Sequence, residues 1–400
     1  MPDPRLDLPA ARLAVRNLPA SRIREVANAG MGNPDVLAFW FGEPDGVTPA
    51  FIRKAAAAAL EAGDTFYSHN LGIAPLREAL SRYLGRWHRP VAADRIAVTS
   101  AGVNALMLAA QLIVSPGDRV VAVVPLWPNV TEIPRILGAE VERVPLHPDA
   151  QGRWVLDLER LLQAMTPGTR AVIINSPGNP TGWVMPREDM SALLDHARRM
   201  GIWIISDEAY ERLVFDTDPG SDGTRCAPSL LDFADPQDRV IVANTFSKAW
   251  QMTGWRLGWL VVPPALLDDL GKLIEFNTSC APGFVQQAAI TALNDGEPHV
   301  RAFVHELRAR RDALLSALAP IDGLSVGSPA GAMYLFFKVP GVTDSLALAK
   351  DLVREAGLGL APGSAFGAEG EGYLRWCFAK PAPMLEEGAR RLAEHLRRRP

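Results

Sequence analysis

Cysteine and lysine are scarce in this sequence, and each shortage narrows the chemistry that it can perform. Only three of its 400 residues are cysteines, and Cys226, Cys280 and Cys377 lie far apart with no CxxC spacing. We therefore expect no disulfide framework and no metal site, and a reduced, cytoplasmic protein. A reaction that needs an amine nucleophile has few candidates: Lys54, Lys248, Lys272, Lys338, Lys350 and Lys380.

Long apolar runs and an excess of one charge are also missing. No stretch approaches the roughly 18 apolar residues that span a bilayer, so we expect no membrane segment. The N-terminus, interrupted by charge and proline, lacks the core of a signal peptide. With 41 basic and 45 acidic residues the formal net charge is −4, which gives no electrostatic reason to bind nucleic acid. The 48% of hydrophobic and 22% of charged residues are typical of a globular protein rather than a disordered one.

Short runs rich in valine and isoleucine alternate with helical patterns in the first two thirds of the chain. The runs do not alternate with polar residues, which is typical of parallel strands covered on both faces. Strands are expected at 95–100, 119–124, 170–176, 202–207 and 239–246, with helices at 73–86, 102–112, 130–137 and 187–200. An earlier helix would begin with Thr48 as N-cap and Pro49 as first residue, and stop at Gly63. We predict an α/β fold with a mostly parallel sheet flanked by helices.

The pattern changes after about residue 280. Helices are expected at 284–294 and 297–318, followed by two strand–helix stretches that begin at 333–339 and 373–379. These predict a smaller α+β domain. We assign residues 46–283 to the large domain, and residues 1–45 together with 284–400 to the small one. The segment 215–237 is the one long loop rich in turn residues.

Polar residues gather where the predicted strands end, the place where open α/β sheets bind ligands. Lys248 follows one strand, beside Thr245, Ser247 and Arg256, whose hydroxyls and guanidinium suit a phosphate. Gly102, at a helix start, offers N–H groups to the same anion. A lysine near a bound phosphate and a buried acid, Asp207, suits pyridoxal phosphate held as a Schiff base.

Three of the residues also fit other roles when each is taken alone. Asp207 fits a helix N-cap, Asn179 a plain turn and Tyr210 a core tyrosine. A strand that ends in Asp-Glu could also belong to a nucleotide site, but the chain has no GxxxxGK[ST] loop. The residues by themselves leave these readings open.

The motifs SPGNPTG (176–182), SDEAY (206–210) and TFSKAWQMTGWRLGW (245–259), in this order and spacing, closely resemble the class I/II aminotransferases of fold type I. The stretches YSHNLGIAPLREAL (67–80), GAMYLF (331–336) and YLRWCFA (373–379) extend the likeness over nearly the whole chain. The resemblance implies pyridoxal phosphate as cofactor and transamination as reaction.

The resemblance implies a role for each residue around the cofactor ring. Lys248 would carry the Schiff base and, once released, would move a proton between the substrate Cα and the cofactor. Asp207 would pair with the ring nitrogen and keep it protonated. Asn179 and Tyr210 would hydrogen-bond the phenolic oxygen. Trp127 would stack on the ring.

The phosphate would be bound by a second group of residues. These are Thr245, Ser247, Arg256 and the N–H groups of Ala101 and Gly102. Tyr67 resembles a tyrosine that reaches across a subunit interface to the neighbouring phosphate, so the resemblance also implies a homodimer with shared active sites.

The substrate would lie against Arg375, whose planar fork fits an α-carboxylate, with Gly42, Trp40 and Asn179 beside it. Several aspartate-specific relatives carry a lysine where this chain has Val103. Together with Trp40 and Phe41, this valine favours neutral or aromatic amino acids over aspartate, with 2-oxoglutarate as acceptor. An arginine from segment 12–24 could still supply a counter-charge.

Two other functions use the same scaffold. One is a pyridoxal-phosphate-dependent β-lyase or cyclising enzyme, which the cofactor-binding residues do not distinguish from a transaminase. The other is a non-catalytic cofactor-binding sensor in a transcription regulator, which would need a DNA-binding domain ahead of the resemblance. We expect only a short segment there, and expect small-molecule partners and no nucleic acid.

Overall fold

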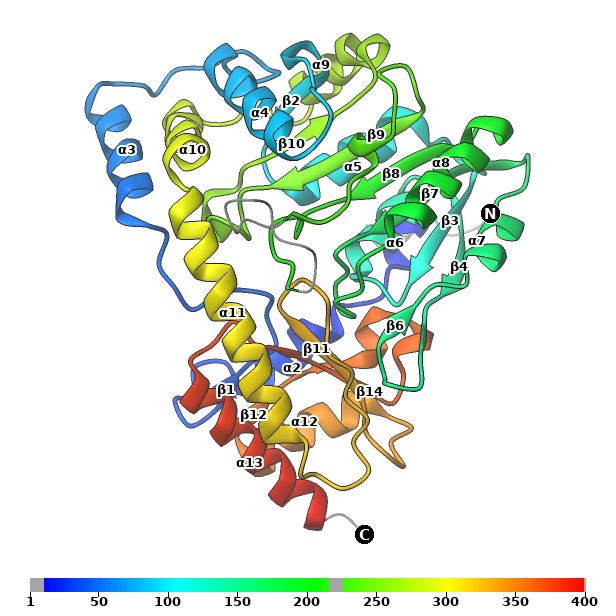
Figure 1. Cartoon of the computed structure of the whole chain (residues 1–400), viewed down its shortest axis with the longest axis vertical. Helices are drawn as coiled ribbons and strands as arrows, with labels where there is room; N and C mark the ends of the chain where they lie inside the picture. The colour runs from blue at the N-terminus through cyan, green and yellow to red at the C-terminus, as the bar shows by residue number, and fades with distance from the viewer. Residues whose placement is uncertain (1–10, 216–225, 399–400) are drawn as a thin grey trace, which may run out of the picture.

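A seven-stranded sheet forms the centre of the larger part of the molecule (Figure 1). The computed structural model describes residues 11–215 and 226–398. The strands lie in the order β2 (Ile96–Thr99), β10 (Gly258–Val261), β9 (Val240–Thr245), β8 (Trp203–Asp207), β7 (Thr169–Asn175), β3 (Arg119–Val124) and β4 (Glu140–Pro145). Only β10 runs antiparallel to its neighbours. The predicted mostly parallel sheet is confirmed.

Both faces of this sheet are buried, because successive residues of each strand enter different cores. Val121 and Ile204 pack into one hydrophobic cluster, whereas Val120 and Ile205 pack into the cluster on the other face. This double burial explains the unbroken valine and isoleucine runs. The helices around the sheet are α3 (Ala50–Glu61), α4 (Ala74–Trp87), α5 (Gly102–Ile113), α6 (Pro128–Ile136), α7 (Leu158–Ala164), α8 (Arg187–Met200), α9 (Leu267–Glu275) and α10 (Gly283–Asp295).

A smaller unit, built around a three-stranded antiparallel sheet, lies below in Figure 1. Its strands are β11 (Tyr334–Lys338), β14 (Tyr373–Cys377) and β13 (Ala361–Pro362), and its helices are α11 (Glu297–Leu318), α12 (Ser345–Ala356) and α13 (Ala382–Arg398). The N-terminal helix α2 (Arg22–Gly30) packs on α12. Strand β1 (Leu37–Ala38) pairs in parallel with β12 (Leu358–Gly359). The two ends of the chain thus share one core, which holds Val26 and Phe39 with Trp376.

The packing of helices α10 and α11 indicates where the two units divide. Helix α10 packs against α3 and α4, and the core of the large unit continues to Val300 at the start of α11. Phe303, one turn later, belongs to the core of the small unit. We therefore propose a boundary within α11 in place of one between 283 and 284.

Local details differ from the sequence-based expectations. Helix α3 starts at Ala50, with Pro49 as N-cap and no side-chain cap. The Thr48 hydroxyl is used elsewhere, since it donates to the carbonyl of Gln251 at 2.6 Å. The expected capping role of Thr48 is therefore wrong. Of the predicted loop 215–237, residues 216–225 lie outside the described part of the chain, and the rest contains a 3₁₀ turn, Leu230–Asp232.

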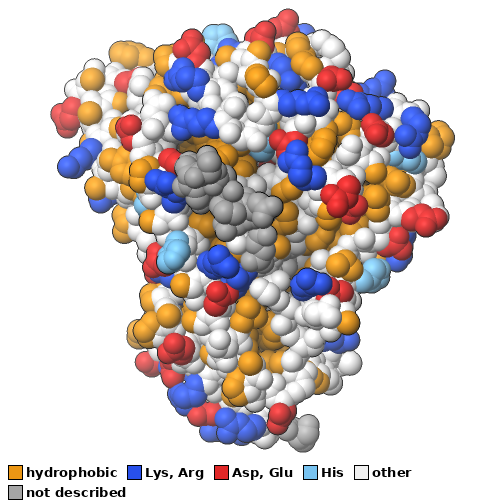
Figure 2. Space-filling model, in the orientation of Figure 1, with side chains coloured by type: hydrophobic (Ala, Val, Ile, Leu, Met, Phe, Trp, Pro, Cys, Tyr) orange, Lys and Arg blue, Asp and Glu red, His pale blue; other side chains and the backbone are white. Residues whose placement is uncertain are grey.

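The remaining α-helix and strands are short. They are the helix α1 (Leu13–Arg16) and the hairpin of β5 (His147–Pro148) with β6 (Trp154–Val155). Among the described residues no helix combines the length and apolar character needed to cross a membrane. Acidic and basic side chains are interspersed on the face shown in Figure 2.

Candidate active site

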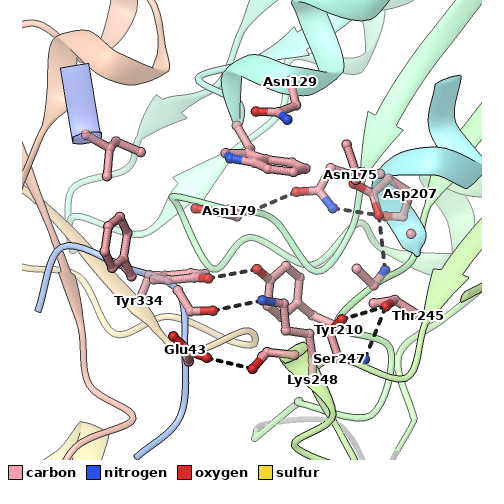
Figure 3. A pocket seen from close by; sticks show the side chains of 18 of the residues that line it. Glu43, Asn129, Asn175, Asn179, Asp207, Tyr210, Thr245, Ser247, Lys248 and Tyr334 are labelled. Carbon is pink, nitrogen blue, oxygen red and sulfur yellow. Dashed lines mark hydrogen bonds between the residues drawn. The ribbon is translucent and has the colours of Figure 1, made fainter. Parts of the chain in front are cut away.

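One cavity of about 540 Å³ gathers nearly all of the predicted site residues (Figure 3). It is walled by strand ends of the large unit and by side chains of the small unit. The predicted residues that line it are Trp40, Gly42, Gly102, Trp127, Asn179, Asp207, Tyr210, Thr245, Ser247, Lys248, Arg256 and Arg375. Ala101 and Tyr67 are not among the lining residues.

Lys248 lies three residues beyond the end of β9 and points into this cavity. Its Nζ donates to the carbonyl oxygen of Gly42 at 2.8 Å and stands 5.6 Å from the centre of the Tyr210 ring. Removal from solvent lowers the pKa of Lys248 to about 8. The amine is therefore closer to its neutral, nucleophilic form at neutral pH than an exposed lysine is.

Asp207 is the last residue of β8 and is buried. Its carboxylate accepts a hydrogen bond from the Ala209 N–H at 3.2 Å, and no cation among the described residues lies within ion-pair distance of it. Burial raises the pKa of Asp207 to about 6. A buried acid without a counter-charge fits a ligand that brings a positive charge, such as a protonated pyridine ring.

Two asparagines hold the floor of the cavity beside Asp207 (Figure 3). Asn175, at the end of β7, donates from Nδ2 to the backbone oxygen of Asp207 at 3.0 Å. Its Oδ1 accepts from the backbone N–H of Asn179 at 2.8 Å. Asn175 thereby connects the turn that contains Asn179 with the end of β8.

Arg375 enters the cavity from β14 of the small unit and is buried. Its Nη1 donates to Asn179 Oδ1 at 3.0 Å, and Nη2 donates to the Trp40 carbonyl. Its Nε has no hydrogen-bond partner, and no acidic side chain among the described residues pairs with the guanidinium. A buried, uncompensated guanidinium fits a carboxylate ligand.

Tyr210 and Tyr334 meet between the two units. Their hydroxyl oxygens are 2.7 Å apart, and burial raises the pKa of both phenols. Each phenol therefore remains a hydrogen-bond donor at neutral pH. A Cβ added to Gly42 would lie 2.0 Å from the Tyr334 hydroxyl oxygen, so only glycine fits opposite it.

The opposite end of the cavity suits an anion. Helix α5 begins there at Gly102, after Ala101, whose φ of +113° lies in a region that favours glycine. A Cβ on Gly102 would stand 3.0 Å from the Thr245 Cβ. The Thr245 hydroxyl oxygen lies 2.9 Å from that of Ser247, and Arg256 also lines this cavity. A helix N-terminus, two hydroxyls and a guanidinium fit a phosphate group.

Of the predicted aromatic residues Trp127 and Tyr67, the first lines the cavity and the second does not. Trp127 precedes α6, lines the cavity, and its backbone N–H donates to the Asn179 carbonyl at 2.9 Å. Tyr67 is 90% exposed, so its predicted role depends on a second chain.

The cavity also contains residues that the sequence did not single out. Tyr334 lies within the GAMYLF stretch but had no assigned role, and Asn175 ends a predicted strand. Arg24 comes from the N-terminal segment suggested as a source of counter-charge. The further lining residues include Ser21, Ile23, Glu43, Leu106, Asn129, Asn244 and Thr253.

Comparison with known proteins identifies the family to which this chain belongs. The model of the family "Aminotransferase class I and II" matches residues 34–392. A probable aspartate aminotransferase of Methanocaldococcus jannaschii is 33% identical over 93% of this chain and 96% of its own. An aromatic-amino-acid aminotransferase of Thermococcus litoralis is 32% identical over 94% and 96%.

A solved structure agrees with these sequences. The aspartate aminotransferase of Thermotoga maritima superimposes with a TM-score of 0.87 and 32% identity, covering 97% of this chain and all of that one. The chain belongs to the class I and II aminotransferases, which share fold type I. It is a pyridoxal-phosphate-dependent transaminase.

Proposed function

We propose that this protein moves an amino group between an L-amino acid and a 2-oxo acid such as 2-oxoglutarate, with the cofactor attached covalently to Lys248. One observation carries the proposal. A single cavity holds an amine with a lowered pKa, a buried acid without a counter-charge, an anion-binding helix start and an unpaired arginine. These match the ring, phosphate and carboxylate that must be held together.

We assign the cofactor-binding roles by the place of each group in or beside the cavity. Asp207 would keep the ring nitrogen charged, and Asn179 and Tyr210 would donate hydrogen bonds to the phenolic oxygen. Trp127 would contact the ring. The phosphate would take Thr245, Ser247, Arg256 and the N–H groups of Ala101 and Gly102. When bound, the cofactor supplies an electron sink for the charge that develops at the substrate Cα.

Lys248 would act as the acid–base group of the reaction as well as the attachment point. Its amine would take a proton from the substrate Cα and deliver it to the cofactor. A pKa of about 8 suits this work, because a base is most effective when its pKa is near the working pH. The carbonyl oxygen of Gly42 accepts a hydrogen bond from this amine and fixes its position in the cavity.

Arg375 would bind the α-carboxylate common to every substrate. Its contacts to Asn179 and to the Trp40 carbonyl fix the plane of the guanidinium. The Gly42 backbone would lie against the same carboxylate. A held planar fork orients the substrate before reaction.

The substrate side chain would meet apolar walls. Ile23, Trp40, Phe41, Val103 and Leu106 all line the cavity, which favours neutral or aromatic amino acids over aspartate. The relatives are named for aspartate as well as for aromatic substrates, so their names do not decide the donor.

Arg24 supports 2-oxoglutarate as the acceptor. Its guanidinium carbon lies 5.5 Å from the centre of the Phe41 ring, and no acidic side chain among the described residues pairs with it. An acceptor with two carboxylates would meet Arg375 with one and Arg24 with the other. A neutral donor would leave Arg24 on the aromatic ring.

We further propose a cytoplasmic homodimer with shared active sites. Phe66 and Tyr67 are 84% and 90% exposed, and Phe276 is 91% exposed. Large aromatic side chains left in water are typical of surfaces that another molecule covers. Tyr67 would then reach the neighbouring phosphate. Sedimentation of the purified protein tests the dimer, and a stable monomer with full activity would contradict it.

The decisive experiment is a single-turnover assay with a panel of amino donors. Transamination leaves the aminated form of the cofactor and one 2-oxo acid, and 2-oxoglutarate then restores the original absorbance. A β-lyase instead regenerates the starting cofactor and releases ammonia with pyruvate. Release of ammonia without a change in cofactor form would overturn the proposal.

A further inference from the structure

A second cluster of reactive side chains lies behind the segment that carries Asp207 and Tyr210. His88 follows α4, Glu211 follows β8, and Cys226 precedes the 3₁₀ turn Leu230–Asp232. One ligand atom of each residue lies within 4.8 Å of those of the other two. None of the three lines the cavity around Lys248, so the cluster is separate from the transamination site.

The orientation of His88 is fixed by a carboxylate. Its Nδ1 lies 2.8 Å from Oδ1 of Asp232, and with the proton on Nδ1 the Nε2 lone pair is available to a cation. Nε2 stands 3.9 Å from the Cys226 sulfur and 3.9 Å from Oε2 of Glu211. A histidine that donates from one ring nitrogen to a carboxylate, and offers the other, is arranged as metal-binding histidines are.

Glu211 contributes an oxygen without a partner. Its Oε1 accepts a hydrogen bond from the Tyr83 hydroxyl at 2.7 Å, whereas its buried Oε2 has no hydrogen-bond partner. The residue is only 3% exposed. An unsatisfied carboxylate oxygen in this position is costly unless a cation or a donor reaches it. It is aimed at the same space as His88 Nε2.

The three ligand types select the kind of ion. Imidazole and thiolate are ligands for zinc and its neighbours, while magnesium and calcium prefer oxygen atoms alone. Zinc binds nitrogen, oxygen and sulfur at about 2.0–2.3 Å, which places ligand atoms roughly 3.3–3.8 Å apart in a tetrahedron. Two of the observed separations are 3.9 Å and the third is within 4.8 Å, so the three side chains would close in by up to about 1 Å to reach this geometry.

We propose that His88, Glu211 and Cys226 bind one Zn²⁺ ion, with Asp232 and Tyr83 holding two of the ligands in place. The ion would join the end of α4, the segment after β8 and the chain before the 3₁₀ turn. It would stabilise the backbone segment that carries Asp207 and Tyr210, on the side that faces away from the cavity. The inference does not depend on the proposed transamination.

Titration of the chelator-treated holoenzyme with Co²⁺, followed by Zn²⁺, tests the site. We expect one Co²⁺ per chain, visible bands of tetrahedral cobalt and a thiolate charge-transfer band. Zn²⁺ should displace the cobalt, and uptake should release protons as the thiol ionises. The metal content of the protein after dialysis gives an independent count. Failure to bind one ion per chain would overturn the proposal.

Variants identify the ligands. Cys226→Ser should abolish the charge-transfer band and weaken binding by about 10-fold or more, and Asp232→Asn should weaken it about 10–100-fold while retaining the band. Cys226 is half-buried, so its replacement by serine leaves the core intact, which circular dichroism would check. Cys280→Ser, at another half-buried thiol, is the matched control and should change nothing. An unchanged spectrum in Cys226→Ser, or equal loss in Cys280→Ser, would refute the site.

Discussion

The segment from Asp207 to Arg212 presents two faces, and they are prepared for different tasks. Asp207 and Tyr210 face the cavity, where no cation of residues 11–215 and 226–398 pairs with the acid. Glu208, Glu211 and Arg212 face the other way, and each makes a side-chain hydrogen bond within the chain. The Glu208 carboxylate accepts from the Ser206 hydroxyl at 2.9 Å, and Arg212 makes two hydrogen bonds with Glu297.

The difference shows how one strand end serves binding and stability at once. Residues on the cavity face leave polar groups for a ligand to satisfy, which costs stability in the empty protein. Residues on the rear face hydrogen-bond within the chain through one carboxylate oxygen of Glu208 and of Glu211 and through Arg212, and these contacts secure the backbone. Changes on the cavity face should therefore reduce turnover and spare folding, and changes on the rear face should spare turnover and alter stability.

The largest effect is expected at the cavity lysine. Lys248→Ala should abolish turnover and the visible absorption of the bound cofactor, because it removes both the covalent link and the base. Lys272→Ala is the control, since that exposed lysine pairs with Asp269 and lies outside the cavity lining. Steady-state assays and absorbance spectra measure both. Normal transamination by Lys248→Ala would defeat the assignment of this residue.

The two neighbouring acids give the sharpest contrast. Asp207→Asn should lower kcat by about 10²–10⁴-fold, since it removes the only charge matched to the ring, worth roughly 3–5 kcal/mol. Glu208→Gln should leave kcat close to that of the wild type. If Glu208→Gln lowers kcat as much as Asp207→Asn does, the two faces are not functionally distinct.

Two buried arginines extend the contrast to substrate binding. Arg375→Ala should lower kcat/KM by roughly 10²–10³-fold for every amino acid alike, mainly through KM, because all share the α-carboxylate. Arg212→Ala should leave KM unchanged and lower the unfolding free energy by about 2–3 kcal/mol, since it leaves Glu297 without its partner. A loss confined to one substrate in Arg375→Ala would contradict a role at the common carboxylate.

The pH dependence of stability separates the faces in a second way. Burial raises the pKa of Glu208 to about 7 from an ordinary value of 4.5, so the folded state binds this proton more tightly than the unfolded state. The unfolding free energy of the metal-free, cofactor-free protein should therefore fall as pH rises from about 4.5 to 7. Glu208→Gln should remove about 2–3 kcal/mol of this fall.

Urea unfolding at pH 5 and pH 8 measures this effect. Asp207→Asn should act similarly in the cofactor-free protein, over a window that ends near the raised pKa of about 6. In the loaded enzyme it should be destabilising, because the ring supplies the missing charge. If Glu208→Gln and Asp207→Asn change the unfolding free energy in the same way with and without cofactor, the two faces are not distinct.

The smallest effect is expected at the rim of the cavity. Arg24→Ala should raise KM for 2-oxoglutarate by about 2–5-fold, as expected for an exposed ion pair, and leave neutral donors unaffected. Arg22→Ala, on the same helix but outside the cavity lining, is the control. An equal rise in KM for a neutral donor would exclude a contact with the second carboxylate.

The sequence predicts the parts of the fold that are buried on both faces. The runs that became β3, β7, β8 and β9 have no polar alternation, and their ends carry Asn179, Asp207 and Lys248 into one cavity. The edge strand β4 was missed because it is only partly buried and its EVERVP sequence lacks the unbroken apolar run of the central strands. Strand β10 was missed because it has only four residues, and the first two, Gly258 and Trp259, belong to the lysine motif.

Contacts between distant residues were beyond the sequence. Tyr334 meets Tyr210 across 124 positions of the chain, and Cys226 meets His88 across 138. No periodicity or local motif encodes such a pair, because the fold alone decides which loops converge. Thr48 shows the same limit, since a carbonyl 203 positions away takes the hydroxyl that local rules assign to a cap.

Helix α11 is anchored at Val300 in one core and at Phe303 in the other, and it runs alongside both units in Figure 1. With its only proline in the first turn, it has no internal break and behaves as a stiff strut. The spacing between the wall that carries Lys248 and the wall that carries Arg375 then depends in part on a rod whose residues do not line the cavity. A repacking at Val300 would alter the width of the cavity from a distance.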